Sequence, residues 1–186
     1  MKAVLLGLLF AAASAAAGDE PLRVGSKRFT ESYILGEIIT RSVPGGAEHR
    51  PGLGNTGIVY AALKAGSIDL YPEYTGTIAR EILKLEGAFT LEELNRRLAP
   101  EGLGVAVRLG FNNTYALAMR ESEAARLGVR NLSDLARHPG LKLGLSQEFI
   151  ARADGWPALK TAYALQQTPA GLDHGLAYEA IAAGKI

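Results

Sequence analysis

The sequence predicts an α/β fold in which short strands alternate with helices. Short apolar runs bounded by turn residues alternate with segments whose apolar residues repeat at helical spacing. Many of the 22 glycines also stand at the expected turns. Hydrophobic residues make up 48% and charged residues 21% of the 186-residue chain, as in ordinary soluble globular proteins. The length suits one domain of about 150 residues or two small lobes.

The amino terminus has the pattern of a signal peptide over residues 1–17. Lys2 supplies a positive charge, the run from Val4 to Ala13 is apolar, and small residues precede the polar segment that starts at Gly18. The apolar run is too short to span a bilayer comfortably. A buried amino-terminal helix is the alternative interpretation. We expect the mature protein to begin near residue 18.

Composition narrows the function classes further. The chain has no cysteine, which excludes a disulfide framework, thiol catalysis, a cysteine-based metal site and a lipid-modified cysteine after the signal. The net charge is +1 and no basic run is present, so no nucleic-acid partner is expected. We expect a periplasmic protein without a lipid anchor.

Strands and helices are expected to alternate through residues 18–110. Thr30 is a good N-cap for the helix after the first strand, and Thr-Leu-Glu-Glu at 90–93 predicts a capping box. The glycine-rich turn at 52–57 lacks the spacing of a dinucleotide fingerprint or a P-loop, so we expect a tight turn whose amides face a cleft. The expected strands are 22–24, about 49–51, 68–70 and 104–108, and the expected helices begin near 30, 57, 77 and 90.

Residues 111–186 continue the pattern with shorter elements. The expected strands are 115–119 and 141–145, and the expected helices are 121–127, one from 131, one with Pro157 in its first turn, and 172–183, with a loop or short helix at 146. Residues 63–69 and 181–186 share a helical end, Ala-Gly, a polar residue and Ile. Because the first passage continues into a strand, we expect the chain to end inside an incomplete second lobe.

The stretch 68–77 predicts a ligand-binding loop. Pro72 cannot donate a ladder hydrogen bond, so the strand should end there. Tyr71 and Tyr74 then lie between the carboxyl end of a strand and the start of a helix, where ligands bind in open α/β sheets and where anions are favoured. The alternative is that both tyrosines are half-buried aromatics that close a core.

Catalysis finds no support in the sequence. The histidines at 49, 138 and 174 show no metal-ligand spacing and are expected to be single surface residues. Asp69 and Glu73 are four residues apart, but Pro72 lies between them, and a Gly-x-Ser-x-Gly elbow is absent. We therefore expect no enzyme, no catalytic residue, no cofactor and no metal site.

Five segments in this order and spacing resemble the substrate-binding proteins of ABC importers for glycine betaine, choline, carnitine and related compatible solutes. Tyr-Pro-Glu-Tyr-Thr-Gly-Thr at 71–77 is specific to that group, and the resemblance extends from about residue 22 to residue 186. The segments are 25–31, 52–56, 68–77, 112–117 and 149–155.

The resemblance implies a periplasmic-binding-protein-like fold of type II, in which two lobes close around a ligand cleft by a hinge motion. Lobe I would occupy 18–110 and lobe II 111–186. Family members continue beyond the position of Ile186, so the second lobe is expected to be truncated at its carboxyl terminus.

The resemblance also implies the cation site. A quaternary ammonium has no N–H to donate, so aromatic ring faces hold it, each at about 0.5–2 kcal/mol. By motif, Tyr74 and Tyr115 are two walls of such a box, and the backbone carbonyl of Asn113 faces the ammonium. Tyr71 is expected to be structural, and Tyr178 is no convincing further wall.

A ligand carboxylate needs cationic or hydroxyl donors. By motif these are Lys27, Thr77 and Arg152. The alternatives are a solvated turn lysine, a plain residue at a helix start and a surface ion-pair partner, respectively.

The function implied is a periplasmic receptor that delivers a quaternary ammonium osmoprotectant to an inner-membrane ABC permease. The alternatives are a truncated or non-functional fragment of such a receptor, or a binding protein for another small polar solute.

Overall fold

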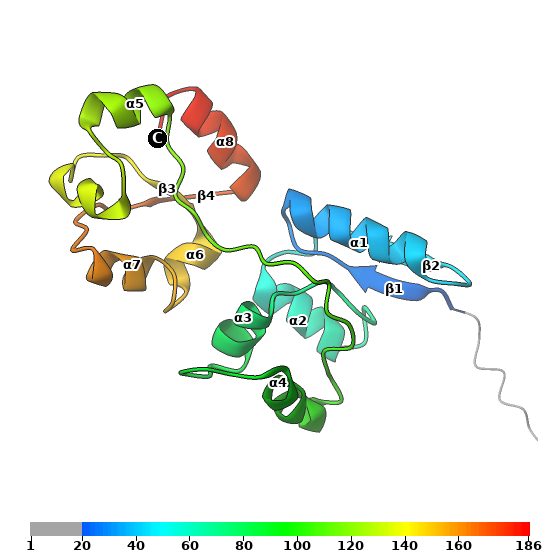
Figure 1. Ribbon diagram of the computed structural model, residues 1–186. Helices are drawn as coiled ribbons and strands as arrows, with labels where there is room; N and C mark the ends of the chain where they lie inside the picture. The colour runs from blue at the N-terminus through cyan, green and yellow to red at the C-terminus, as the bar shows by residue number, and fades with distance from the viewer. Residues whose placement is uncertain (1–19) are drawn as a thin grey trace, which may run out of the picture.

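The computed structural model describes residues 20–186, so the signal peptide predicted for residues 1–17 lies outside the described part of the chain. Two parallel strand pairs in different parts of the chain each carry their own helices (Figure 1). Residues 20–102 form lobe I and residues 121–186 form lobe II, and the segment 103–120 between them has no regular structure. The predicted boundary at 110/111 falls within this segment and stays a prediction.

In lobe I, β1 (Leu22–Gly25) pairs with β2 (Ala47–Arg50) in register from Leu22↔Ala47. The third strand predicted at 68–70 is reduced to one parallel bridge between Val24 and Leu70. Pro72 has no N–H with which to continue a ladder. Val24 is fully buried, so this small sheet still forms part of the interior of the lobe.

Helices cover this sheet and form a separate core beside it. They are α1 (Thr30–Ser42), α2 (Thr56–Lys64), α3 (Thr75–Thr77) and α4 (Leu91–Leu98), with a 3₁₀ turn at Ala99–Glu101. The helix predicted from 77 begins at Thr75 and continues as a π-helical turn at Ile78–Ile82. The buried apolar residues of this core are Ile78, Ala79, Leu94 and Leu98.

The predicted capping box at 90–93 is half present. Thr90 Oγ1 accepts the Glu93 N–H at 3.2 Å and caps α4. The Glu93 carboxylate instead pairs with Arg97 at 3.4 Å. The helix start is therefore set by the threonine alone.

The strands predicted at 104–108 and 115–119 are wrong. Val107 is 75% exposed and Leu109 49% exposed, because no neighbouring strand covers their apolar alternation. The N–H of Val105 donates to the Asn95 side chain at 2.6 Å rather than to a strand. The segment 103–120 is instead an irregular connector from lobe I into lobe II (Figure 1).

In lobe II, β3 (Gly144–Ser146) pairs with β4 (Ala170–Leu172) in parallel. The strand predicted at 141–145 thus begins three residues later than expected. Strand β4 was not predicted, because its three residues show no apolar alternation. The other elements are α5 (Glu121–Leu127), a 3₁₀ turn at Leu132–Arg137, α6 (Gln147–Ala151), α7 (Trp156–Ala162) and α8 (His174–Ala182).

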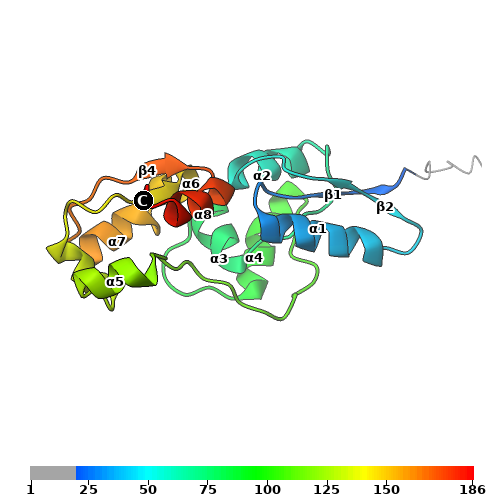
Figure 2. The same cartoon turned by 90° about the horizontal axis from the view of Figure 1, so that it is seen from above.

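Lobe II has a core of its own, formed by Leu135, Phe149, Trp156 and Leu165. Pro157 stands in the first turn of α7, as predicted. Figure 2 shows the two lobes next to each other, with α6 and α8 on the side of lobe II that faces lobe I. Within residues 20–186, no helix has both the length and the apolar character needed to cross a membrane.

Candidate ligand-binding site

The structure brings all six predicted site residues to the region where the two lobes meet. Lys27 follows β1, Tyr74 precedes α3 and Thr77 ends it, and Arg152 caps the end of α6. Asn113 and Tyr115 lie on the connector. Residues that are far apart in sequence therefore contribute to one region.

Lys27 is a buried residue, so it is not the solvated turn lysine of the alternative interpretation. Its side chain is 4% exposed. Nζ donates to Glu73 Oε1 at 2.6 Å and to Thr56 Oγ1 at 3.2 Å. It also lies 5.3 Å from the centroid of the Phe29 ring. In this structure a carboxylate of the chain itself therefore balances the lysine charge.

Glu73, which sequence reasoning left without a role, is the buried partner of that lysine. Its Oε1 also accepts the Tyr74 N–H at 2.9 Å. Its Oε2 is buried and has no hydrogen-bond partner among the described residues. Burial raises the pKa of Glu73, against the opposing effect of the Lys27 charge.

Tyr74 and Asn113 join the two sides of the site through Glu31. The Tyr74 hydroxyl donates to Glu31 Oε1, and Asn113 Nδ2 donates to Glu31 Oε2 at 2.7 Å and to the Tyr74 hydroxyl at 3.3 Å. Burial and the bond to Glu31 raise the pKa of Tyr74 to about 12, so the ring stays neutral at pH 7. Phe111 meets the Tyr74 ring edge-on at 6.3 Å between centroids. The contacts of Asn113 are made by its side chain, and the role of its backbone carbonyl stays a prediction.

Arg152 is buried, 4% exposed, and its guanidinium is surrounded by acceptors. Nε and Nη2 donate to the Asp154 carboxylate at 2.9 and 2.8 Å, and Nη1 donates to Thr77 Oγ1 at 3.2 Å. Glu148 Oε1 lies 3.7 Å from Nη1. The hydrogen bonds from Arg152 hold the pKa of Asp154 below its usual range. Arg152 is thus an ion-pair partner, as the alternative held, but a buried one that contacts a second predicted site residue.

Tyr115 presents an open ring beside that guanidinium. It is 59% exposed and packs at 4.6 Å and a tilt of 46° on Phe149. The guanidinium carbon of Arg152 lies 5.7 Å from its ring centroid. Tyr74 pairs with Phe111 and Tyr115 with Phe149, so the two predicted walls belong to separate aromatic pairs.

A run of polar contacts, here called the interlobe polar chain, crosses from one lobe to the other. Thr56 accepts from Lys27 and donates to Glu148, through Oγ1 at 2.7 Å and through its N–H at 3.3 Å. Glu148 approaches Arg152, and Arg152 bonds Thr77. Charged and hydroxyl groups therefore make this series of contacts between the lobes.

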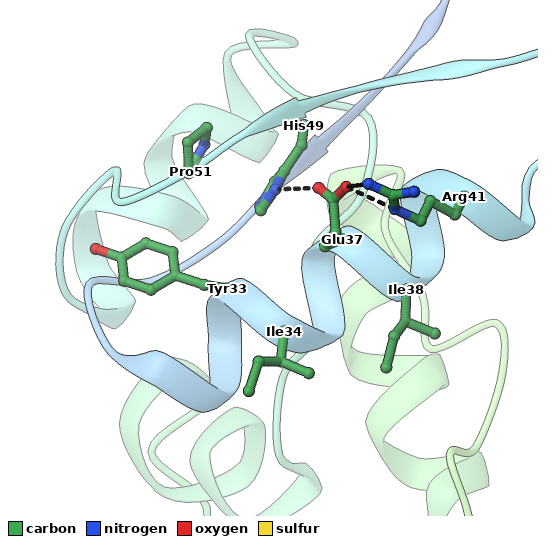
Figure 3. A pocket seen from close by; sticks show the side chains of 7 residues that line it. All are labelled: Tyr33, Ile34, Glu37, Ile38, Arg41, His49 and Pro51. Carbon is green, nitrogen blue, oxygen red and sulfur yellow. Dashed lines mark hydrogen bonds and ion pairs between the residues drawn. The ribbon is translucent and has the colours of Figure 1, made fainter.

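Two hollows are present in the described part of the molecule. The one between the lobes, of about 360 Å³, has Thr56 and Glu148 of the interlobe polar chain in its lining. The larger one, of about 560 Å³, lies over the outer face of α1 and contains none of the predicted site residues. Figure 3 shows its side chains, with Glu37 between His49 and Arg41. The smaller hollow is not lined by any of the six predicted site residues either, and it adjoins the candidate site only through Thr56 and Glu148.

His49 is not the single surface histidine that was predicted. Its side chain is 13% exposed; Nε2 lies 2.9 Å from Ser26 Oγ, and Nδ1 lies 3.2 Å from Glu37 Oε2. This order resembles a serine–histidine–carboxylate triad. Ser26 is fully buried, however, so a substrate has no access to its hydroxyl. The contacts of His49 with Ser26 and Glu37 therefore hold the loop after β1 in place and do not provide a nucleophile.

The other two histidines differ from each other. His138 has a buried Nε2 without a hydrogen-bond partner among the described residues, so it too departs from the surface prediction. His174 is exposed, as predicted, and its ring contacts Phe29 and Tyr178. Within residues 20–186, no group of three or more potential metal ligands is present.

Besides Glu73, four contributors to the site were missed from the sequence. Glu31, Thr56 and Asp154 stand inside the quoted segments, and Glu148 stands one residue before the last of them. The pattern Arg-x-Asp at 152–154 could have signalled Asp154 as a close partner of the arginine. The contact between Thr56 and Glu148 spans 92 residues, and no local pattern carries it.

Comparison with known proteins gives one consistent picture. Residues 20–186 match the family described as the substrate-binding domain of ABC-type glycine betaine transport systems, OpuAC. A glycine-betaine-binding protein of Pseudomonas aeruginosa is 35% identical over 93% of this chain and 61% of its own length. The glycine betaine-binding protein YehZ of Escherichia coli is 33% identical over 77% of this chain and 52% of its own.

A third relative has a different named ligand. The ergothioneine transport permease/ergothioneine binding protein EgtU of Helicobacter pylori is 34% identical over 99% of this chain and 36% of its own length. The chain thus spans between about a third and three fifths of the lengths of these three relatives.

Solved structures agree with the fold. Apo YehZ from Escherichia coli superposes with a TM-score of 0.51 at 31% identity, over 86% of this chain and 64% of that one. A glycine betaine/carnitine/choline ABC transporter structure superposes with a TM-score of 0.59 at 23% identity, over 90% of this chain and 66% of that one. The periplasmic-binding-protein-like α/β fold expected from the sequence is confirmed.

Proposed function

Because the chain belongs to the family of substrate-binding domains of ABC-type glycine betaine transport systems, we propose that it is the solute-binding component of an ABC importer for a quaternary ammonium compound. Glycine betaine and choline are the type ligands. The observation that carries the proposal is the convergence of Tyr115, Arg152 and Thr77 from the connector and the two lobes. Hinged lobes that meet through polar groups provide a closable site for a small solute.

The aromatic side chains supply the chemistry for the cation. Tyr74 is neutral, and more than half of the Tyr115 side chain is exposed. Aromatic ring faces attract a quaternary ammonium, whereas hydrogen-bond acceptors form no N–H hydrogen bond with it, because it has no N–H group. Phe111, 50% exposed and in edge contact with Tyr74, is a further aromatic side chain near the first wall.

The proposed setting is the periplasm, with an inner-membrane permease as partner. The family is one of transport substrate-binding proteins rather than of enzymes, and such proteins of ABC importers are typically extracytoplasmic. The signal-peptide pattern of residues 1–17 supports export. We therefore assign no catalytic residue to the chain.

A second candidate ligand has a specific observation in its favour. One relative is named as an ergothioneine-binding protein. Ergothioneine also carries a quaternary ammonium and a carboxylate, so the same cation site would serve it. The opposite alternative is that the chain is a non-functional fragment that binds no solute. A binding measurement distinguishes this alternative from a functional receptor.

The test is isothermal titration of residues 18–186 with choline, glycine betaine, carnitine and ergothioneine. We expect saturable binding of at least one of them and a rise in melting temperature with its concentration, because a ligand of the native state stabilises it. A chain that unfolds cooperatively but binds none of the four would contradict the proposal.

A further inference from the structure

His49 lies between α1 and the loop that carries Lys27. Its Nδ1 lies 3.2 Å from Glu37 Oε2 on α1, and its Nε2 lies 2.9 Å from the Oγ of Ser26, the residue directly before Lys27. Figure 3 shows the imidazole pointing at Glu37 in the wall of the larger hollow. The side chain of His49 is 13% exposed, whereas Ser26 is fully buried. The ring therefore connects a group that water reaches with a hydroxyl that water does not reach.

The ring and the hydroxyl have little freedom to move apart. The ring packs against Gly36 of α1, where an added Cβ would lie 2.5 Å from His49 Nε2. The Ser26 N–H donates to the Arg50 carbonyl at 3.2 Å, and the Ser26 carbonyl accepts the Leu53 N–H at 3.0 Å. A change in the protonation of the ring must therefore be taken up between these same partners.

The partners of His49 determine where the neutral ring carries its hydrogen. Hydrogen bonds from Arg41 and His49 hold the pKa of Glu37 below its usual range, so Glu37 is a carboxylate that can only accept. Nδ1 therefore carries the hydrogen, and Nε2 accepts the Ser26 hydroxyl. A protonated ring must donate from Nε2 instead. The Ser26 hydroxyl, which makes no other hydrogen bond within residues 20–186, then loses its acceptor.

A movement of Ser26 acts on Lys27. A buried hydroxyl without an acceptor is costly, so the loop has to adjust when the ring is protonated. The Lys27 N–H donates to Ser32 Oγ at 2.8 Å, and Nζ donates to Glu73 at 2.6 Å and to Thr56 at 3.2 Å. Hydrogen bonds of this length are lost when one partner moves by about 1 Å. The protonation of a ring outside the candidate site is thus coupled to a predicted ligand residue.

The other charged side chains on the elements around His49 are mostly bound in ion pairs of 2.7–2.8 Å. Glu37 belongs to one of these pairs and also contacts the ring. Arg28, in the loop after β1, is exposed, and Tyr33 of α1 lines the hollow. The pairs are Arg41–Glu37 on α1, Glu48–Arg50 on β2 and Arg23–Asp69 from β1.

Building on the function proposed above, we propose that His49 is a positioning residue that makes solute binding depend on pH. The neutral ring holds Ser26, and through it Lys27, in the geometry of the site, and the protonated ring releases them. Histidine titrates between about pH 5 and 8, so the affinity falls as the pH falls through this range. Burial raises the pKa of Glu73, which is the second group at the site that could respond to pH.

The first test measures the Kd of choline and of glycine betaine at pH 7.5 and 5.5 by isothermal titration. Neither solute titrates in this range, so a change belongs to the protein. Wild type should bind about tenfold more weakly at pH 5.5, because a buried hydroxyl loses its acceptor. His49→Gln keeps a neutral acceptor for Ser26 and should change less than about twofold. His138→Gln, the same replacement in lobe II, is the matched control and should change as wild type does.

A second variant separates the hydrogen bond from the charge of the ring. Ser26→Ala leaves His49 free to titrate but removes the hydroxyl that links it to the loop. The pH dependence of Kd should therefore be lost in Ser26→Ala as well. If it persists there in full, the charge of the imidazolium acts directly on the site, and the positioning role is wrong.

A third measurement needs no solute. The nitrogen chemical shifts of the three histidine rings give the tautomer of each, and His138→Gln and His174→Gln identify the other two signals. His49 should carry its hydrogen on Nδ1 at pH 7.5 and gain a second proton over the range in which Kd changes. A hydrogen on Nε2 at pH 7.5 would contradict the proposal.

Two results of the titrations would overturn the role of His49 while the proposed function stands. One is an equal Kd of wild type at both pH values. The other is a change that His49→Gln retains in full, which would assign the titration to Glu73. A folded chain that binds neither solute at either pH would contradict the proposed function and the role of His49 together.

Discussion

Arg152 of lobe II donates a hydrogen bond from Nη1 to Thr77 Oγ1 of lobe I across 3.2 Å. The two residues are 75 positions apart, and both side chains are almost fully buried. A bond of this kind exists only while the lobes adjoin. It therefore belongs to the energy of closure as well as to the site.

Thr77→Val is predicted to weaken ligand binding about fivefold. The substitution keeps the shape of the side chain but removes the acceptor of a buried charged donor, which costs about 1 kcal/mol or more. Titration with the best-bound quaternary ammonium measures the change. Thr161→Val removes a similar hydroxyl bond, to Pro157 on α7, and should not alter Kd. Equal effects of the two variants would show that the Arg152 bond does not contribute to binding.

Tyr74→Ala and Tyr115→Ala are each predicted to weaken every quaternary ammonium ligand. Loss of one ring face costs about 0.5–2 kcal/mol, or roughly two- to thirtyfold in Kd. Tyr74→Phe keeps the ring and should retain most of the affinity, although it loses the bonds to Glu31 and Asn113. If Tyr74→Phe bound the ligand as weakly as Tyr74→Ala, the hydroxyl of Tyr74 rather than its ring would be the group that contributes to binding.

The Tyr74 phenol is predicted to ionise near pH 12 rather than near pH 10. The folded pKa is raised, so the stabilising contribution of the neutral phenol is complete below about pH 10 and is lost as the pH rises through the folded value. Tyrosinate absorbance, taken as the difference between wild type and Tyr74→Phe, isolates this group. Glu31→Gln should lower the pKa only in part, since burial is the larger cause. No shift in that variant would exclude the Glu31 bond as a cause.

Leu94→Ala is predicted to loosen lobe I selectively. Leu94 is fully buried, and truncation of such a leucine costs about 2–5 kcal/mol. Because the core around it is separate from the one around Trp156, native-state hydrogen exchange should accelerate mainly in α4 and its neighbours. Leu165→Ala is the mirror experiment in lobe II. Uniform acceleration across residues 20–186 in either variant would show that the lobes unfold as one unit.

The sequence predicts the helices of this chain better than its strands. Helix starts depend on local sequence: α4 follows its Thr90 cap, and α1 begins close to the predicted position. The predicted N-cap of α1 is wrong, because Phe29 holds that place and Thr30 is the first helical residue, with no side-chain capping bond. Strands need a partner from elsewhere, so the alternating residues around Val107 look like a strand but have no neighbour to pair with. The three residues of β4 show no alternation, yet they pair because β3 lies beside them.

The same reasoning applies to the candidate site. Motif spacing identified Arg152 and Thr77, which the structure places in contact. It could not supply Glu148 as the partner of Thr56, because that contact depends on how the lobes adjoin. The electrostatic state of Lys27 likewise depends on a carboxylate 46 residues away. Local sequence therefore indicated the groups of the site but not which of them neutralise one another.

The connector at 103–120 carries two of the proposed ligand residues, Asn113 and Tyr115, on irregular backbone. A solute bound against these two residues also restrains the connector between the lobes. Arg108 is exposed on the connector and is a residue after which trypsin cleaves. Cleavage requires the backbone around Arg108 to be mobile enough to enter the active site of the protease. The rate of tryptic nicking at this arginine is therefore a built-in reporter of occupancy, one that needs neither a labelled solute nor a permease.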